Sequence, residues 1–343
     1  MKYSVLVLLL IVGTACSTGE KRKPFTSVHI QPVLEDSVSI RAIEFLDRNT
    51  LAFAGSNGMF GTVDVKTQNV RSNTQQHDSL FPEFRAVAKT SKDFFMLSAG
   101  NPALVYKTGE FGKMELVYKE EGEGVFYDSM KFWDDKEGIA IGDTMQGCLS
   151  IILTEDGGKH WQKLPCSRLP PADEAEGAFA ASNTNLAIIG DKVWIATTGG
   201  NVYSSGDRGK NWTKTSTPIV QEKPTEGIYS IDFYNGKIGF AIGGDYTQPE
   251  SNKANKIVTQ DGGLSWQLAA DGAEPNYKSC VQFVPNTGGK GLVATGFTGI
   301  SYSHDGGVNW NKLSDEGFYS LRFLNDTIAY ASGKNRIAQL VFK

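Results

Sequence analysis

The sequence predicts an all-β protein, a seven-bladed β-propeller of four-stranded antiparallel blades whose ring is closed by an N-terminal strand. Three observations lead to this prediction. An octapeptide of the form [S/T]-x-D-x-G-x-x-W recurs four times. Its acidic position, counted from a degenerate first copy, recurs every 44 to 54 residues, which is room for four short strands. Apolar segments repeat with the same spacing, and seven units of about 46 residues fill the chain from Phe25 onward.

The octapeptide has the composition of a tight hairpin turn. Its hydroxyl and carboxylate can bond the turn backbone, its glycine can adopt a left-handed conformation, and its tryptophan can fold back over the hairpin. It resembles the Asp-box of BNR-repeat proteins. We therefore assign a structural role to the fixed acids and indoles, which are Asp156, Trp161, Asp207, Trp212, Asp261, Trp266, Asp305 and Trp310. The degenerate copy, Thr108 to Glu115, has Glu110 and Glu115 in place of Asp and Trp.

The two ends of the chain suggest how the ring closes. The last unit stops at Lys343, after its third strand, and an extended stretch from Val28 to Val33 precedes the first full unit. We expect this stretch to supply the missing outer strand, which would remove the exposed edges of an open array. Residues 25–343 then form the propeller.

The first residues have the pattern of an export signal. One lysine, Lys2, precedes an apolar run from Val5 to Val12, which is too short to span a bilayer. Gly13-Thr14-Ala15-Cys16 resembles a bacterial lipobox, so residues 1–15 are interpreted as a signal peptide, Cys16 as a lipidated residue and 16–24 as a tether. We expect a protein lipid-anchored to a membrane of the bacterial cell envelope, either periplasmic or surface-exposed.

Composition limits the partners and the chemistry. With 34 basic and 38 acidic residues, the net charge of −4 provides no broad positive field, and nucleic acid is excluded as an expected partner. No metal-binding, nucleotide-binding or serine-nucleophile motif occurs, so we expect no metal and no cofactor. Cys148 and Cys166 lie symmetrically about Gly157, which predicts a disulfide across that hairpin; the remaining thiol is Cys280.

A second motif marks a candidate binding surface. Glu-Gly followed by an aromatic residue recurs in the loops that lead into the innermost strands, on the face opposite the Asp-box turns. Each copy is either a turn with a core aromatic or part of a recognition ring. An insertion at 243–252 lies on the same face. The candidate ligand-binding residues are Glu83, Arg85, Glu123, Tyr127, Glu176, Glu226, Tyr229, Tyr246, Glu316 and Tyr319.

The combined pattern, an innermost strand such as Arg85-Ala86-Val87, then A-x-x-G, then T-x-D-G-G-x-x-W, resembles the photosystem II assembly and stability factor family and its bacterial lipoprotein relatives. The resemblance implies a binding or assembly platform without a cofactor. We expect a non-catalytic monomer that recognises a protein or glycan partner on the face opposite the Asp-boxes, the glycan being a separate interpretation of the same loops. The alternative is a sialidase-like glycoside hydrolase, to which Phe84-Arg85-Ala86-Val87 and the arginines Arg41, Arg85 and Arg322 are the nearest match.

Overall fold

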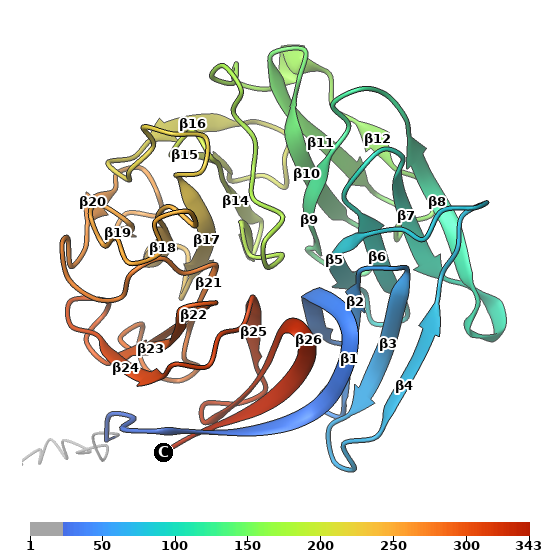
Figure 1. Cartoon of the computed structure of the whole chain (residues 1–343). Helices are drawn as coiled ribbons and strands as arrows, with labels where there is room; N and C mark the ends of the chain where they lie inside the picture. The colour runs from blue at the N-terminus through green and yellow to red at the C-terminus, as the bar shows by residue number, and fades with distance from the viewer. Residues whose placement is uncertain (1–22) are drawn as a thin grey trace, which may run out of the picture.

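The computed structural model describes residues 23–343, which form a ring of twisted antiparallel sheets around a central channel (Figure 1). The predicted signal peptide, Cys16 and the tether as far as residue 22 lie outside the described residues. Within residues 23–343, no helix is long and apolar enough to cross a membrane.

Five of the sheets have four strands each, in which every strand pairs with the next one along the chain. The first two sheets are β5(Phe84–Lys89), β6(Phe94–Ser98), β7(Ala103–Thr108), β8(Met114–Glu120) and β9(Tyr127–Phe132), β10(Gly138–Met145), β11(Cys148–Thr154), β12(Gln162–Lys163). The next is β13(Leu186–Ile189), β14(Lys192–Ala196), β15(Asn201–Ser205), β16(Thr213–Ser216). The last two are β17(Ile228–Phe233), β18(Gly239–Gly243), β19(Lys256–Thr259), β20(Gln267–Leu268) and β21(Cys280–Phe283), β22(Leu292–Gly296), β23(Gly299–Ser303), β24(Asn311–Ser314).

The sixth sheet joins the two ends of the chain in the strand order β25-β26-β1-β2-β3-β4. These strands are β25(Ser320–Phe323), β26(Ile328–Phe342), β1(Val28–Phe45), β2(Thr50–Gly55), β3(Met59–Asp64) and β4(Val70–Thr74). Residues 28–35 of β1 pair with residues 336–342 of β26, and residues 40–45 pair with β2. The N-terminal strand therefore holds the last repeat unit against the first.

The prediction of seven separate four-stranded blades is wrong, because the strands form six hydrogen-bonded sheets. The strands expected to make a seventh, β25 and β26, belong to the same sheet as β1 to β4. The reason lies in β1, which runs without interruption from its pairing with β26 to its pairing with β2. The repeat period of a sequence gives the number of repeat units. It does not show that one continuous strand is hydrogen-bonded to strands of two units and so joins them in one sheet.

Burial within each sheet falls from the channel outward. The second strands are almost entirely buried, as in β6 and β18, whereas β4, β12 and β20 at the rim are mostly exposed. Neighbouring sheets pack small residues against large ones. Ala52 and Ala54 of β2 share a cluster with Phe84 of β5 and Met96 of β6. Burying apolar area between sheets contributes about 25 cal/mol per Å², and these contacts hold each sheet of the ring against its neighbours.

The Asp-box turns have the bonding that their composition requires. In the second box the Ser205 hydroxyl donates to Asp207 Oδ1 at 2.8 Å, and the N–H groups of Lys210 and Asn211 donate to the same oxygen at 3.1 and 2.9 Å. The Gly209 N–H donates to the Ser205 hydroxyl, and Gly209 has a φ of 81°. The other three boxes repeat the hydroxyl–carboxylate bond. Trp161, Trp266 and Trp310 are buried, and Trp212 is half-buried.

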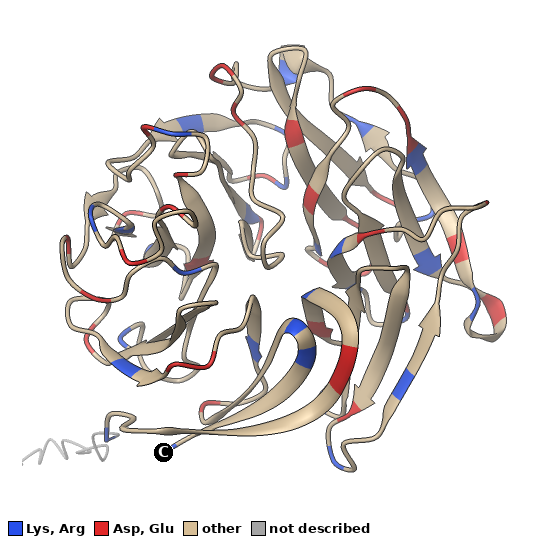
Figure 2. Cartoon of the chain, in the orientation of Figure 1, with Lys and Arg blue, Asp and Glu red and all other residues tan. Residues whose placement is uncertain are grey.

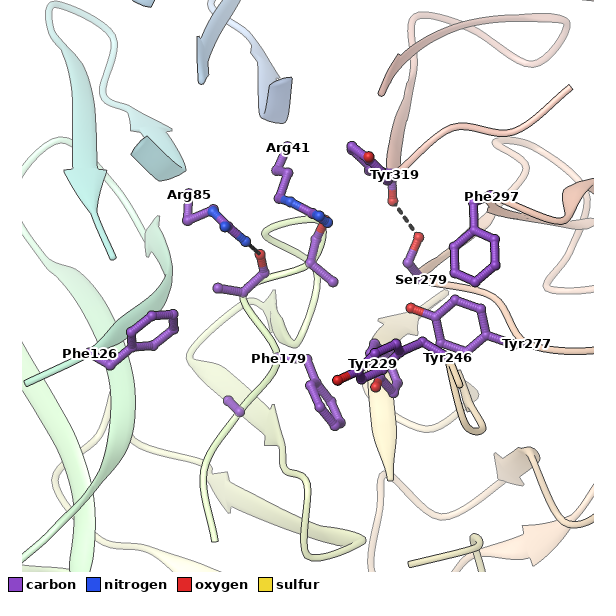
Figure 3. A pocket seen from close by; sticks show the side chains of 13 residues that line it. Arg41, Arg85, Phe126, Phe179, Tyr229, Tyr246, Tyr277, Ser279, Phe297 and Tyr319 are labelled. Carbon is purple, nitrogen blue, oxygen red and sulfur yellow. Dashed lines mark hydrogen bonds between the residues drawn. The ribbon is translucent and has the colours of Figure 1, made fainter. Parts of the chain in front are cut away.

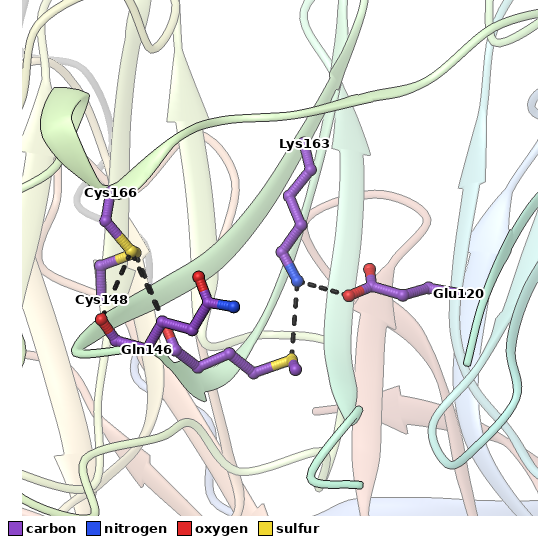
Figure 4. The surroundings of a disulfide bond; sticks show 6 residues. Glu120, Gln146, Cys148, Lys163 and Cys166 are labelled. Atoms are coloured by element: carbon purple, nitrogen blue, oxygen red, sulfur yellow. Dashed lines mark hydrogen bonds and ion pairs between the residues drawn. A yellow bond between two sulfur atoms is a disulfide. The ribbon is translucent and has the colours of Figure 1, made fainter. Parts of the chain in front are cut away.

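Cys148 and Cys166 form a disulfide with Cα atoms 5.5 Å apart (Figure 4). Cys148 begins β11, while Cys166 lies in the short 3₁₀ helix η2(Cys166–Arg168) that follows β12 rather than on the partner strand. Nearby, Lys163 Nζ forms an ion pair with Glu120, which ties this sheet to the preceding one. Cys280 is a buried free thiol.

The central channel is filled by one stretch of chain, residues 182–185, which we call the channel segment. All four residues are almost completely buried. Asn183 Nδ2 donates to the Val87 carbonyl of β5 at 2.7 Å, and Asn183 Oδ1 accepts from the Met130 N–H of β9 at 3.1 Å. Ser182 and Thr184 bond groups of β17 and β25 and the carbonyl of Ser279, which immediately precedes β21. Because this stretch occupies the channel, β13 begins only at Leu186.

The pairing of β1 with β26 can be tested by a matched pair of substitutions. Ile30 packs against the apolar cluster of the last repeat unit, and His29 beside it is exposed. We expect Ile30→Asp to lower the free energy of unfolding by about 2 to 3 kcal/mol, because it buries a charge without a partner. His29→Asp should change it by less than about 0.5 kcal/mol. Denaturant unfolding measures both, and equal effects would contradict a closing role for this strand.

The Asp-box carboxylates predict a specific loss of stability in acid. Hydrogen bonds from the Asn211 side chain and backbone lower the pKa of Asp207 from 3.8 to about 2. A carboxyl with a depressed folded-state pKa stabilises the fold above its unfolded pKa, and this contribution is lost as the pH falls. We expect the melting temperature to fall between about pH 4 and pH 2, and to fall less steeply in Asp207→Asn. Identical pH profiles for the two proteins would contradict this account.

Candidate functional site

A pocket of about 360 Å³ lies over the channel segment, at the end of the channel where the innermost strands begin (Figure 3). The Asp-box turns lie at the opposite end. The second sheet shows why: β9 runs away from the pocket, β10 returns, and β11 runs away again to end at Thr154, the first residue of an Asp-box. The pocket therefore occupies the face on which the sequence placed the candidate ligand-binding residues.

β-Bulges turn side chains from the innermost strands into the pocket. The pairing register shifts by one residue between Ile40 and Ala42, between Phe84 and Ala86, and between Ile228 and Ser230. The extra residue in each strand, Arg41, Arg85 or Tyr229, lines the pocket. A bulge inserts an unpaired residue and re-aims its side chain, which is why strands buried on both faces can still present polar groups to a ligand.

Aromatic rings form most of the pocket wall. Phe179 stacks on Tyr229 with ring centroids 3.6 Å apart, Tyr277 meets Tyr229 edge-on at 4.9 Å, and Phe297 lies 5.1 Å from Tyr277. Tyr246 and Phe297 are 48% and 46% exposed, so their faces are open to a ligand. The aromatic lining residues are Phe126, Phe179, Tyr229, Tyr246, Tyr277, Phe297 and Tyr319. Such rings provide stacking surfaces for apolar, aromatic or cationic groups.

Two arginines give the pocket a positive charge. Arg85 Nη1 donates to the Ala180 carbonyl at 3.1 Å, and its Nε pairs with Glu83 at 2.9 Å. Arg41 lies over the Tyr319 ring at 4.0 Å, and its buried Nε has no hydrogen-bond partner in the described part of the chain. Burial and the adjacent Arg85 guanidinium lower the pKa of Arg41. An anionic group in the pocket would offset this repulsion and accept the unused donors. We call this site the aromatic–arginine pocket.

Four of the predicted ligand-binding residues meet in this pocket, namely Arg85, Tyr229, Tyr246 and Tyr319. Glu83 supports them by pairing with Arg85. Tyr246 reaches the pocket from the insertion at 243–252, and Tyr319 precedes β25. The loops therefore converge as the Glu-Gly-aromatic motif suggested, although their aromatic residues contribute more to the pocket than their acids.

The remaining predicted residues lie elsewhere. Glu176 and Glu226 are buried beneath their own loops: Glu176 accepts from Thr197, Asn201 and Tyr203, and Glu226 accepts from two backbone N–H groups. Tyr127 is buried in the sheet core, where its hydroxyl donates to Glu120 at 2.7 Å. Glu123 is exposed outside the pocket, and Glu316 pairs with Arg336 at 2.7 Å. Local bonding explains Glu176, Glu226, Tyr127 and Glu316 without a ligand, and Glu123 lies on the exposed surface.

Five charged or aromatic lining residues do not belong to the predicted ligand-binding set: Arg41, Phe126, Phe179, Tyr277 and Phe297. Phe126 and Phe179 belong to copies of the motif. Phe126 and Tyr127 are adjacent aromatic residues, and the sequence does not show which of the two faces the pocket and which faces the core. Arg41 aligns with Arg85 at the start of its unit, and this alignment was the signal that could have identified it. Tyr277 and Phe297 carry no motif.

The polar and ring groups that line the pocket are arginine, serine and aromatic side chains. Among residues 23–343 no group of three or more His, Cys, Asp or Glu side chains could hold a metal ion. The lining of the aromatic–arginine pocket contains no carboxylate, whereas glycosidases of the usual type act through a pair of them. Arg322, the third arginine of the sialidase comparison, lies among the channel groups, where it donates to the carbonyls of Leu321 and Asn183. It therefore cannot complete a triad with Arg41 and Arg85 in this pocket.

The fold is a β-propeller that carries the aromatic–arginine pocket on the face away from its Asp-box turns. No protein-family model matches the chain. In sequence, the chain is 42% identical over 60 residues to "Photosystem II stability/assembly factor HCF136, chloroplastic" of Guillardia theta. The matched stretch covers 17% of this chain and 14% of that relative.

Solved structures share the fold over nearly the whole chain. "YCF48 bound to D1 peptide" has a TM-score of 0.66 at 15% identity and covers 93% of this chain and 98% of that one. "YCF48 from Cyanidioschyzon merolae" has a TM-score of 0.65 at 12% identity, covering 92% and 98%. "Crystal structure of RRP9 WD40 repeats" has a TM-score of 0.66 at 11% identity, covering 94% and 99%. At these identities the likeness shows the propeller fold alone.

The predicted resemblance to photosystem II stability and assembly factors is confirmed, in a short stretch of sequence and in a shared propeller fold. The predicted location is contradicted by the same comparison, because the curated relative is a chloroplast protein and not a lipid-anchored protein of a bacterial cell envelope. The physical reason is that an N-terminal apolar run indicates export but does not identify the membrane system.

The two kinds of glutamate in the motif can be separated by substitution. Glu226 is buried, and its carboxylate accepts from the N–H groups of Glu222 and Lys223 at 2.6 and 3.0 Å. We expect Glu226→Ala to lower the free energy of unfolding by about 2 kcal/mol, because two backbone donors lose their buried acceptor. Glu123→Ala, at an exposed copy of the motif, should change it by less than about 0.5 kcal/mol. Thermal or denaturant unfolding would show the difference, and a large effect of the Glu123 variant would contradict the assignment.

Proposed function

We propose that this protein is a non-catalytic binding factor that holds an extended segment of a partner protein in the aromatic–arginine pocket. The observation that carries the proposal is the convergence of seven aromatic side chains and two arginines, with no carboxylate, over a sealed channel. The proposed ligand is a peptide segment that places apolar or aromatic side chains against the rings and an acidic group near Arg41 and Arg85. Aromatic and arginine side chains are the usual centres of binding energy in protein recognition.

The comparisons support a protein ligand. One solved structure with the same fold is described as bound to a peptide, and the curated relative is described as a stability and assembly factor. The glycan alternative relied on acidic acceptors in the loops, and Glu176 and Glu226 are already engaged by their own sheets and loops. A monomer is proposed because the chain closes its ring with its own N-terminal strand. Lipidation of Cys16 stays a prediction from the sequence.

Charge distribution is consistent with local rather than broad electrostatic recognition. In Figure 2 the lysines, arginines, aspartates and glutamates are interspersed around the ring instead of gathering on one sheet. The attraction for an acidic group therefore comes from Arg41 and Arg85 at short range. Binding should weaken only modestly with added salt, because charges buried at the contact are screened less than exposed ones.

The proposal is tested by selecting ligands from a random 12-residue peptide library and measuring the affinity of recovered peptides by fluorescence anisotropy. Tyr246→Ala combined with Phe297→Ala should weaken binding by about 30- to 1000-fold, since truncating two interface aromatics costs roughly 1 to 2 kcal/mol each. Both side chains are about half exposed, so the fold should be retained.

The matched control is Leu264→Ala, which removes a 77% exposed side chain from an Asp-box turn on the opposite face and should leave affinity unchanged. Circular dichroism would verify that each variant is folded. Failure to recover any peptide that distinguishes the wild-type protein from the double variant would overturn the proposal. Binding on a glycan array that the double variant loses would instead identify a sugar ligand.

A further inference from the structure

Asp128 is a buried acid that the fold does not explain. It is fully buried, and neither oxygen of its carboxyl group has a hydrogen-bond partner within the described residues. Buried polar groups are nearly always bonded, and an exception calls for a functional explanation. Asp128 is also the extra residue of a β-bulge, because Tyr127 pairs with Gly142 and Ser129 with Ile141. It thus holds in β9 the position that Arg41, Arg85 and Tyr229 hold in their own strands.

A second acid, Asp143 on the adjoining strand β10, is close enough to Asp128 for the two charges to repel each other, and it lies nearer the surface. Its Oδ1 accepts from the Ala178 N–H at 2.9 Å, and the residue is half-buried. It lines a second pocket of about 700 Å³, together with Glu174 and Glu222. Ala178 and Phe179 line both pockets and form a wall between them. We call this second site the acidic pocket.

The charges that face the acidic pocket leave it negative. Lys223 is its one cationic lining residue among those described, and it already pairs with Glu226 and Asp245 at 3.6 and 3.5 Å. Glu176 is engaged by Thr197, Asn201 and Tyr203. Behind the wall, Arg85 attracts Asp128, but its own hydrogen bonds go to Glu83 and Ala180. Burial, followed by the repulsion of Asp143, raises the pKa of Asp128.

We infer that the acidic pocket takes a lysine or arginine side chain of the partner segment, with Asp143 as the direct acceptor and Asp128 as a buried second charge. This inference rests on the proposed function, because it extends the same bound segment across the wall from the aromatic–arginine pocket. The occupant is an extended peptide with an acidic or apolar part in one pocket and a basic residue in the next. A cationic side chain in the pocket would bond the Asp143 carboxylate, one oxygen of which already accepts from Ala178, and would be attracted by Asp128, which lies buried outside the pocket lining.

A metal ion is the other cation to consider. Ca²⁺ and Mg²⁺ require six or more oxygen ligands in well-defined geometry, whereas an ammonium or guanidinium group needs two or three acceptors. No group of three or more suitable side chains occurs among the described residues. The pocket therefore fits an organic cation, and addition of calcium chloride serves as a competing arm of the test.

The experiment uses a peptide recovered against the wild-type protein that contains one lysine or arginine, and a matched copy with norleucine at that position. Asp143→Asn should weaken the basic peptide about 10-fold and leave the norleucine copy unchanged. Glu155→Gln, an exposed acid on the Asp-box face, should affect neither. Affinity for the basic peptide should rise with pH as the raised-pKa carboxyls of Asp128 and Asp143 lose their protons. Equal effects of Asp143→Asn on both peptides would overturn the inference.

A second arm needs no peptide and no variant. Arginine amide is added to protein labelled with ¹³C, and the carboxyl signals of Asp128 and Asp143 are followed by NMR. The inference expects both signals to shift and the apparent pKa of each carboxyl to fall, because a bound cation favours the charged form. Signals that do not move, or that move only with calcium chloride, overturn it. If no library peptide binds but these signals shift, the proposed function fails while the cation pocket is supported.

Discussion

The hydrogen bonding of the channel segment is the constraint on which the rest of the structure depends. Residues 182–185 leave the sheet edge and enter the channel, where they bond innermost strands on opposite sides of the ring. A propeller is otherwise held only by contacts between neighbouring sheets. The segment adds bonds between sheets that are not neighbours, and in a buried setting each unmade bond would cost about 1 to 3 kcal/mol. It also seals the channel and gives the aromatic–arginine pocket a floor.

The lining of the aromatic–arginine pocket follows in part from a small irregularity that recurs in several innermost strands. Innermost strands are packed on both faces, so an unbroken strand would send every side chain into the core. One extra residue in each of β1, β5 and β17 changes this, and these residues, Arg41, Arg85 and Tyr229, line the pocket. Asp128 is the corresponding extra residue of β9, but its side chain is fully buried near Asp143. The aromatic–arginine pocket and the acidic pocket lie on either side of Ala178 and Phe179, which line both.

Much of the architecture could be predicted from the sequence. The Asp-box fixes its own turn through bonds within eight residues, so Asp207 and its equivalents have the predicted partners. The closing role expected for residues 28–33 agrees with their pairing to β26. The sheet count could not be predicted, because it depends on β1 being continuous. Which of the adjacent aromatics Phe126 and Tyr127 lines the pocket could not be predicted either. The path of the strand at this point depends on a bulge, and the bulge depends on pairing with β10.

The sequence alone determined the repeat, the chemistry of the Asp-box turns and the placing of the candidate residues on the opposite face, since these depend on residues close together in the chain. Tertiary structure decided which side chains meet. Arg41 and Ala181 are 140 residues apart, yet they are brought together by ring closure and by the channel segment. It also decided that Glu176 and Glu226 bond within their own sheets and loops, and that Asp128 is left without a partner. Such outcomes depend on the packing of separate sheets, which a local pattern does not encode.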